Sequence, residues 1–136
     1  MILPEHLIVF QDGKKECTNI GEWEKVNSLI KTINFCETEI IVQDVNIGLA
    51  NSVINGVNYA LSNFDAVIVI EDDCVTAKSF MAFMIEALTK YEKYKKVFQI
   101  GGYSIPFFSE SKNEILFYGR AESWVWSTWK DKWKFS

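Results

Sequence analysis

The sequence predicts an α/β fold built around a mostly parallel sheet. Short apolar runs alternate with longer stretches in which apolar residues recur at helical spacing, in the order β-α-β-α-β-α-β-β-α. The run Ala-Val-Ile-Val-Ile at 66–70 is continuously apolar, as in a strand that is buried on both faces of a parallel sheet. With 136 residues, of which 49% are hydrophobic, the chain is expected to form a single domain over residues 1–136.

The first half of the chain is expected to contain two strands and two helices. Asp12-Gly13 supplies the turn after the first strand. Gly56 falls in the middle of the second helix, where it is unfavourable by about 1 kcal/mol relative to Ala. Close packing of that helix on the sheet would explain this glycine. The expected elements are a strand at 7–10, a helix from 21 to 34, a strand at 39–43 and a helix from 49 to 61.

The second half begins with the apolar strand and is expected to continue with the longest amphipathic helix. Cations at Lys95 and Lys96 suit the carboxyl end of that helix. Trp126, Trp129 and Trp133 are spaced for one face of a final helix, which would lie largely in the core. The expected elements are a central strand at 66–70, a helix from 80 to about 94, strands at 97–100 and 114–118, and a helix in the tryptophan-rich tail.

Three acidic residues, Glu71, Asp72 and Asp73, follow the buried strand without a spacer. Adjacent carboxylates repel one another and are costly to bury. In open α/β sheets, ligands bind at the carboxyl ends of the strands, and a divalent cation there would relieve the repulsion. Carboxylate oxygens suit Mg²⁺ or Mn²⁺, with phosphates completing the shell. The alternative is that these acids form a solvated turn and cap the next helix.

Composition argues against several classes of function. The net charge is −4 and there is no basic block, so we expect no nucleic-acid partner. Three widely spaced cysteines and one histidine do not suggest a zinc site or a disulfide framework, and they fit a reducing compartment. No apolar run approaches the length of a transmembrane segment, and we expect a cytoplasmic location.

Further polar residues flank the aromatic tail. Arg120 and Glu122 precede it, and Glu122 or Asp131 could supply a carboxylate beside an aromatic wall that suits sugar rings. The alternative is that the tail only fills the core. Gly101-Gly102 would let the backbone approach a ligand closely, although a simple turn is the favoured interpretation.

Four segments together resemble glycosyltransferases of the GT-A fold. The resemblance is to family 2-like bacterial sugar transferases, and the chain is also similar to the Golgi N-acetylglucosaminyltransferase that starts complex N-glycans. The acidic segment looks like the DxD-type metal motif of this family, and the tail resembles its acceptor-side segment. The segments are LIVFQDG at 7–13, NIGLA at 46–50, VIVIEDDCV at 67–75 and FYGRAESWVWSTWKDKW at 117–133.

The resemblance implies a three-layer sandwich that transfers a sugar from a nucleotide-sugar donor to a hydroxyl of a saccharide or other acceptor, in the biosynthesis of surface polysaccharide or glycans. Asp73 would ligate Mn²⁺ or Mg²⁺, which acts as a Lewis acid on the leaving diphosphate. Glu71 and Asp72 would contact ribose or sugar. The donor-side residues are Asp12, Glu71, Asp72 and Asp73, and the acceptor-side residues are Arg120, Trp124 and Trp126.

The chain also departs from the family pattern. It starts one strand later, and it stops at Ser136, before the usual position of the general base. Val125 stands where the family has a glycine. We therefore expect a domain that is incomplete at both ends, with Glu122 and Asp131 as the candidate bases within it. The alternatives are a non-catalytic carbohydrate- or nucleotide-binding remnant and a receiver-like signalling domain. The arrangement of Asp and Lys that a receiver needs is not found.

Overall fold

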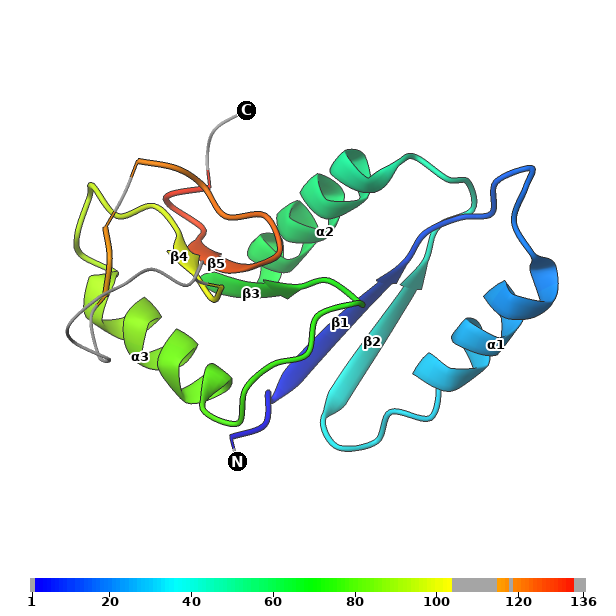
Figure 1. Ribbon diagram of the computed structural model, residues 1–136, viewed down its shortest axis with the longest axis horizontal. Helices are drawn as coiled ribbons and strands as arrows, with labels where there is room; N and C mark the ends of the chain where they lie inside the picture. The colour runs from blue at the N-terminus through cyan, green and yellow to red at the C-terminus, as the bar shows by residue number, and fades with distance from the viewer. Residues whose placement is uncertain (1, 104–114, 118, 134–136) are drawn as a thin grey trace. The chain divides into compact units, whose positions relative to one another are not determined.

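The computed structural model describes residues 2–103, 115–117 and 119–133. The chain divides into two compact units, Met1–Asn63 and Phe64–Ser136, each with its own sheet (Figure 1). The mixed α/β class is confirmed, whereas the single domain over residues 1–136 stays a prediction. Within the described ranges, none of the helices combines the length and the apolar character needed to cross a membrane.

The first unit is a β-α-β arrangement followed by a second helix. Strands β1 (His6–Gln11) and β2 (Glu37–Val42) run parallel, in register from His6 opposite Glu37 to Gln11 opposite Val42. Helix α1 (Ile20–Ile30) connects them, and α2 (Leu49–Asn63) follows β2. The elements predicted for this half are confirmed, with boundaries that differ by a few residues.

Gly56 in α2 lies directly over a side chain of β1. A Cβ atom at this position would stand 3.2 Å from Cδ2 of Phe10. The aromatic ring of Phe10 also meets Tyr59, one turn further along α2, in a T-shaped arrangement. The expectation that close packing of the helix on the sheet explains this glycine is confirmed.

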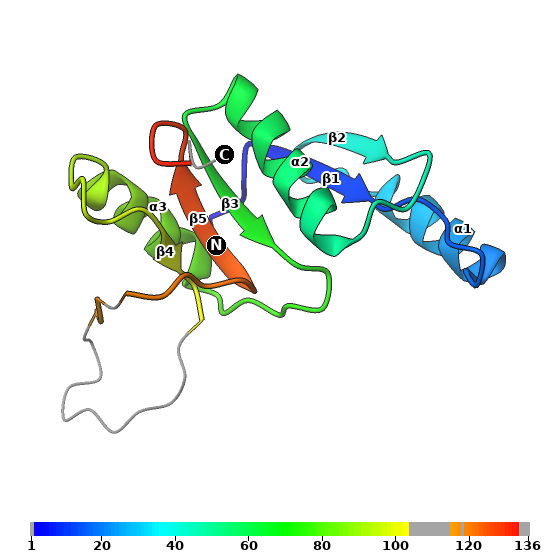
Figure 2. The same ribbon diagram turned by 90° about the horizontal axis from the view of Figure 1, so that it is seen from above.

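The second unit contains three strands and one helix. They are β3 (Ala66–Ile70), α3 (Phe80–Tyr91), β4 (Ile100–Gly101) and β5 (Val125–Trp129). β5 lies between β3 and β4 and runs antiparallel to both (Figure 2). β3 is therefore an outer strand of an antiparallel sheet, and its side chains are only half-buried. The expectation that 66–70 is a central strand of a mostly parallel sheet is wrong for this unit.

The tryptophan-rich tail forms a strand, so the predicted helix is a second error. All five residues of β5 are buried, because the strand lies in the middle of the sheet. A strand that is covered on both faces shows no alternation of polar and apolar residues, and periodicity alone cannot distinguish such a run from a buried helix. Val, Trp and Thr are residues that favour strands, which agrees with the outcome.

The core of the second unit lies between α3 and the sheet. Met84 is fully buried at its centre, and Trp129 donates its indole N–H to the carbonyl of Leu88 at 3.2 Å. The strand predicted at 97–100 is only the two residues of β4. The strand predicted at 114–118 lies partly outside the described residues, and 115–117 are not in a strand. The buried core residues are Phe80, Met84, Ala87, Tyr91, Ile100, Val125 and Trp129.

Candidate functional site

The acidic segment and the start of the aromatic tail meet at one edge of the sheet in the second unit. Because β5 is antiparallel to its neighbours, Ile70 pairs with Val125 and Gly101 pairs with Trp126. The carboxyl ends of β3 and β4 therefore lie beside the amino end of β5. We call the segments that continue from these ends, 71–74, 102–103 and 123–124, the acidic edge.

The acids of this edge lie in a turn that is open to solvent. The backbone N–H of Cys74 donates to the carbonyl of Glu71 at 3.1 Å, which closes the turn. Asp72 and Asp73 are exposed, and Glu71 is half-buried. The thiol of Cys74 lies 3.7 Å from Oδ1 of Asp73. Desolvation is the main effect that raises the pKa of Cys74 above its ordinary value, and the negative charge of Asp73 adds to it.

Two exposed aromatic rings stand at the same edge. The rings of Trp124 and Tyr103 have centroids 4.8 Å apart at an interplanar angle of 62°. The side chains remain 51% and 43% exposed, respectively. The Cys74 sulfur lies 3.9 Å from the carbonyl oxygen of Trp124, which joins the acidic turn to the aromatic segment. Two exposed aromatic rings in an edge-to-face arrangement thus adjoin the carboxylates, an arrangement suited to ligands with both apolar and polar faces.

Glu122 is held beside the start of β4 by a residue that the sequence did not single out. The side-chain amide of Gln99 donates to the carbonyl of Glu122 at 2.9 Å, and Gln99 Oε1 accepts from the backbone N–H of Glu122 at 2.6 Å. The Glu122 carboxylate accepts from the N–H of Ser123 at 3.2 Å. Arg120 is exposed and lines, with Glu122, a hollow of about 410 Å³ beside α3 and β4. The side chain of Gln99 thus positions the segment around Glu122 by bonding to the Glu122 backbone.

Gly102, the residue that follows β4, has a packing role. A Cβ atom at Gly102 would stand 2.7 Å from Phe80 and 3.1 Å from Val125, so a larger residue would push β4 away from the core. The N–H of Gly102 donates to the carbonyl of Val125 at 2.7 Å, which extends the strand pairing by one bond. These contacts explain why a glycine occupies position 102, and they bring Tyr103 to the acidic edge.

Two of the expected site residues are not part of this edge. Trp126 is only 5% exposed, and its ring stacks on Trp133 with centroids 5.5 Å apart. It belongs to the interior and does not offer its ring to an acceptor. Asp131 follows Trp129, which pairs with Ala66 at the start of β3. Since β5 rises about 3.4 Å per residue, Asp131 lies at the opposite end of the sheet from Asp73. The structure therefore does not bring Trp126 or Asp131 together with the acids at 71–73.

Asp12 belongs to the first unit and takes part in a turn that satisfies its carboxylate. Oδ1 accepts from the N–H of Gly13 at 3.0 Å, and Oδ2 accepts from Nδ2 of Asn46 at 2.7 Å. The Asp12 carbonyl accepts from the indole N–H of Trp23 at 3.1 Å. A Cβ atom at Gly13 would stand 2.2 Å from the backbone of Val45, so only glycine fits. These contacts give Asp12 a structural role at the carboxyl ends of β1 and β2.

Among the residues that the structure describes, no three His, Cys, Asp or Glu side chains converge to hold a metal ion by themselves. The exposed carboxylates of Asp72 and Asp73 are nonetheless suitable donors for Mg²⁺, which usually takes one or two carboxylates and completes its shell with water and substrate phosphates. The donor set therefore fits a cation that arrives together with a phosphorylated ligand. It does not fit a closed, all-protein metal centre.

No family model matches this chain, and neither a curated protein nor a solved structure does.

Proposed function

We propose that this chain is a metal-dependent glycosyltransferase domain of the GT-A type, which transfers a sugar from a nucleotide-sugar donor to a hydroxyl acceptor. One observation carries the proposal. The carboxylates at 71–73, of which Asp72 and Asp73 are exposed, and the exposed rings of Tyr103 and Trp124 lie at one edge of a sheet, beside the carboxyl ends of β3 and β4. In open, mostly parallel α/β sheets, ligands bind outside the carboxyl ends of the strands; in this antiparallel sheet β3 and β4 present their carboxyl ends here. The parallel pair of β1 and β2 also agrees with part of the expected sheet.

The roles follow from the chemistry of each side chain. Asp73 is the proposed metal ligand, and Glu71 and Asp72 bind the ribose or sugar hydroxyls of the donor. When bound, Mn²⁺ or Mg²⁺ would stabilise the charge on the leaving nucleoside diphosphate. Trp124 and Arg120 bind the acceptor, because sugars present apolar C–H faces to aromatic rings and hydroxyls to polar groups. Glu122 is the candidate general base.

The test is a calorimetric titration of Mn²⁺ into this protein with and without uridine or guanosine diphosphate. Asp73→Asn keeps the shape of the side chain but removes its charge, so nucleotide-dependent Mn²⁺ binding should be lost. Asp65→Asn is the matched control, since Asp65 is an exposed acid at the other end of β3 and its loss should leave binding unchanged. Equal binding by the Asp73→Asn variant would show that the acids form only a solvated turn.

The second candidate is a carbohydrate- or nucleotide-binding module without catalysis. The observation that favours it is the carboxylate of Glu122, which bonds to the N–H of Ser123 in its own turn. The two functions separate in one assay, which measures nucleoside diphosphate released from a nucleotide-sugar. A binding module would bind Mn²⁺ and nucleotide without releasing product in the presence of a saccharide acceptor, whereas a transferase would turn over.

A further inference from the structure

Lysines gather at the end of the second unit that lies opposite the acidic edge. Residues 90–96 and 130–132 contain six lysines against two acids, a local net charge of +4 in a chain whose net charge is −4. The first segment spans the end of α3, and the second is the turn after β5. We call this the lysine-rich end. Its lysines are Lys90, Lys93, Lys95, Lys96, Lys130 and Lys132.

Lys132 fixes the two segments against each other. Its Nζ donates to the carbonyl of Tyr91 at 2.9 Å and to that of Tyr94 at 3.4 Å, so it caps the end of α3. The same Nζ lies 3.5 Å from the ring centre of Trp129. Burial lowers the pKa of Lys132, although Asp131 and Glu92 partly oppose the shift. The two segments of the lysine-rich end are therefore held together by packing and hydrogen bonds.

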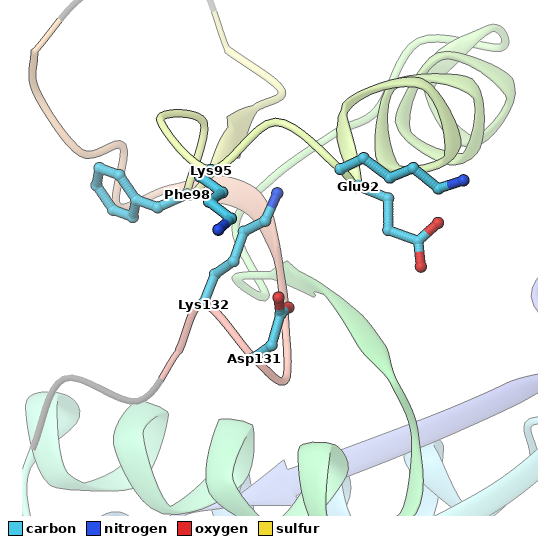
Figure 3. Close-up of a pocket in the computed structure, with 6 residues that line it drawn as sticks. Glu92, Lys95, Phe98, Asp131 and Lys132 are labelled. Atoms are coloured by element: carbon cyan, nitrogen blue, oxygen red, sulfur yellow. The ribbon is translucent and has the colours of Figure 1, made fainter.

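The surface around this anchor combines exposed cations with exposed aromatic rings. Lys93, Lys95 and Lys96 are exposed, and the side chains of Tyr94 and Phe98 are 57% and 45% exposed. Figure 3 shows the open hollow at this end, which has a volume of about 590 Å³. Its lining residues are Glu92, Lys93, Lys95, Phe98, Asp131 and Lys132.

We propose that the lysine-rich end docks on an anionic membrane surface. Lysines near such a surface are attracted to its negative potential, and amphipathic aromatic rings favour the interface between lipid and water. Glu92 and Asp131 line the hollow itself, which disfavours a compact polyanion inside it and favours a charge spread over a surface. Because Trp124 precedes β5 and Asp131 follows it, docking here would keep the acids at 71–73 away from the negative lipids.

The attraction should be weak, reversible and sensitive to salt, because it depends on exposed charges that salt screens. The experiment is co-sedimentation of the whole chain with vesicles. Vesicles that mix phosphatidylglycerol with phosphatidylcholine should bind the protein at low salt and release it at high salt. Vesicles of phosphatidylcholine alone should bind little. Equal binding to both kinds of vesicle, or no binding to either, would overturn the proposal.

Matched variants locate the surface. The triple substitution Lys93→Gln, Lys95→Gln and Lys96→Gln should weaken binding to anionic vesicles about a hundredfold, because each lysine near the surface contributes roughly a factor of five. The control is Lys15→Gln, Lys25→Gln and Lys31→Gln, three exposed lysines of the first unit, with the same change of charge. Equal losses in the two triple variants would mean that net charge alone governs binding, and would overturn the proposal.

Two further experiments separate the remaining explanations. Replacing Lys93, Lys95 and Lys96 by Arg keeps the charge and should keep vesicle binding, which separates loss of charge from loss of folding. A single-stranded uridine oligonucleotide at the same ionic strength should bind less tightly than the anionic vesicles. If the oligonucleotide binds more tightly and the glutamine triple at 93, 95 and 96 abolishes this, the partner is a nucleic acid and the membrane proposal is wrong.

Discussion

The two ends of β5 use the same residue type in opposite ways. At the amino end, Trp124 is half-exposed beside a turn of acids and meets the ring of Tyr103 edge to face. At the carboxyl end, Trp129 is 4% exposed, bonded to the carbonyl of Leu88 and covered by the amine of Lys132. The amino end leaves its aromatic and charged groups open to solvent. The carboxyl end uses an aromatic ring and a lysine to fasten the sheet to α3.

This difference teaches that a tryptophan-rich segment can hold both a core and a candidate binding surface within a few residues. Burial decides the role of each ring. A ring that is packed on all sides contributes to stability, whereas an exposed ring beside exposed carboxylates contributes little to stability and is available to a ligand. The comparison predicts that substitutions at the carboxyl end of β5 mainly lower stability, and that substitutions at its amino end mainly weaken ligand binding.

The largest expected effect is on stability at the carboxyl end. Trp129→Ala should lower the free energy of unfolding by about 3–5 kcal/mol, because it removes a buried ring and leaves a cavity. Trp124→Ala, at the exposed end, should cost less than about 1 kcal/mol, and it should weaken binding of saccharides. Urea denaturation followed by circular dichroism measures the free energy of unfolding of both variants. A Trp129→Ala variant as stable as the parent would mean that this ring faces solvent or a site.

The next effect concerns the lysine that caps α3. Lys132→Gln should cost about 1 kcal/mol, because it loses the charged bonds to the carbonyls of Tyr91 and Tyr94 at a half-buried position. Lys95→Gln removes the same charge from an exposed side chain and should change the free energy of unfolding by less than about 0.5 kcal/mol. Thermal unfolding of the two variants side by side is the measurement. Equal costs would contradict the anchoring role of Lys132.

The smallest effect lies in the middle of β5. Ser127 is fully buried, and within the described part of the chain its hydroxyl has no hydrogen-bond partner. Ser127→Ala should therefore stabilise the protein, by about 1 kcal/mol at most. Thr128→Val is the contrasting change, because the hydroxyl of Thr128 donates to the carbonyl of Phe98 at 2.6 Å and its loss should be destabilising. Destabilisation by Ser127→Ala would indicate a partner for the hydroxyl in solution.

Much of the secondary structure could be predicted from the sequence, because helical spacing and apolar runs are local signals. The elements from β1 to α3 are confirmed on that basis. The direction of β5 could not be predicted, since β3 and β5 are far apart in the sequence and their pairing depends on long-range packing. The run Val125–Trp129 carried no alternation to mark it as a strand, and the spacing of its tryptophans also suited a helix.

The candidate site could likewise be predicted only in part from the sequence. The acids at 71–73 were recognisable from sequence because charge follows an apolar strand without a spacer. Tyr103 and Gln99 were not, because their importance arises only when β4 and β5 pair. The antiparallel pairing also removes Trp126 and Asp131 from this edge, since it sends one into the core and the other to the far end. A single sequence carries no signal for that geometry.

The most direct test of the acidic edge as a ligand site is paramagnetic broadening of backbone amide signals by Mn²⁺ in the presence of a nucleoside diphosphate. Signals from 71–74 and from Ser123 and Trp124 should lose intensity at the lowest Mn²⁺ concentration, while those from 130–132, at the other end of β5, should persist. Asp73→Asn should abolish the selective loss. If the signals from 130–132 vanish first, or if all signals fade together in both proteins, the acidic edge is not the site of metal and nucleotide binding.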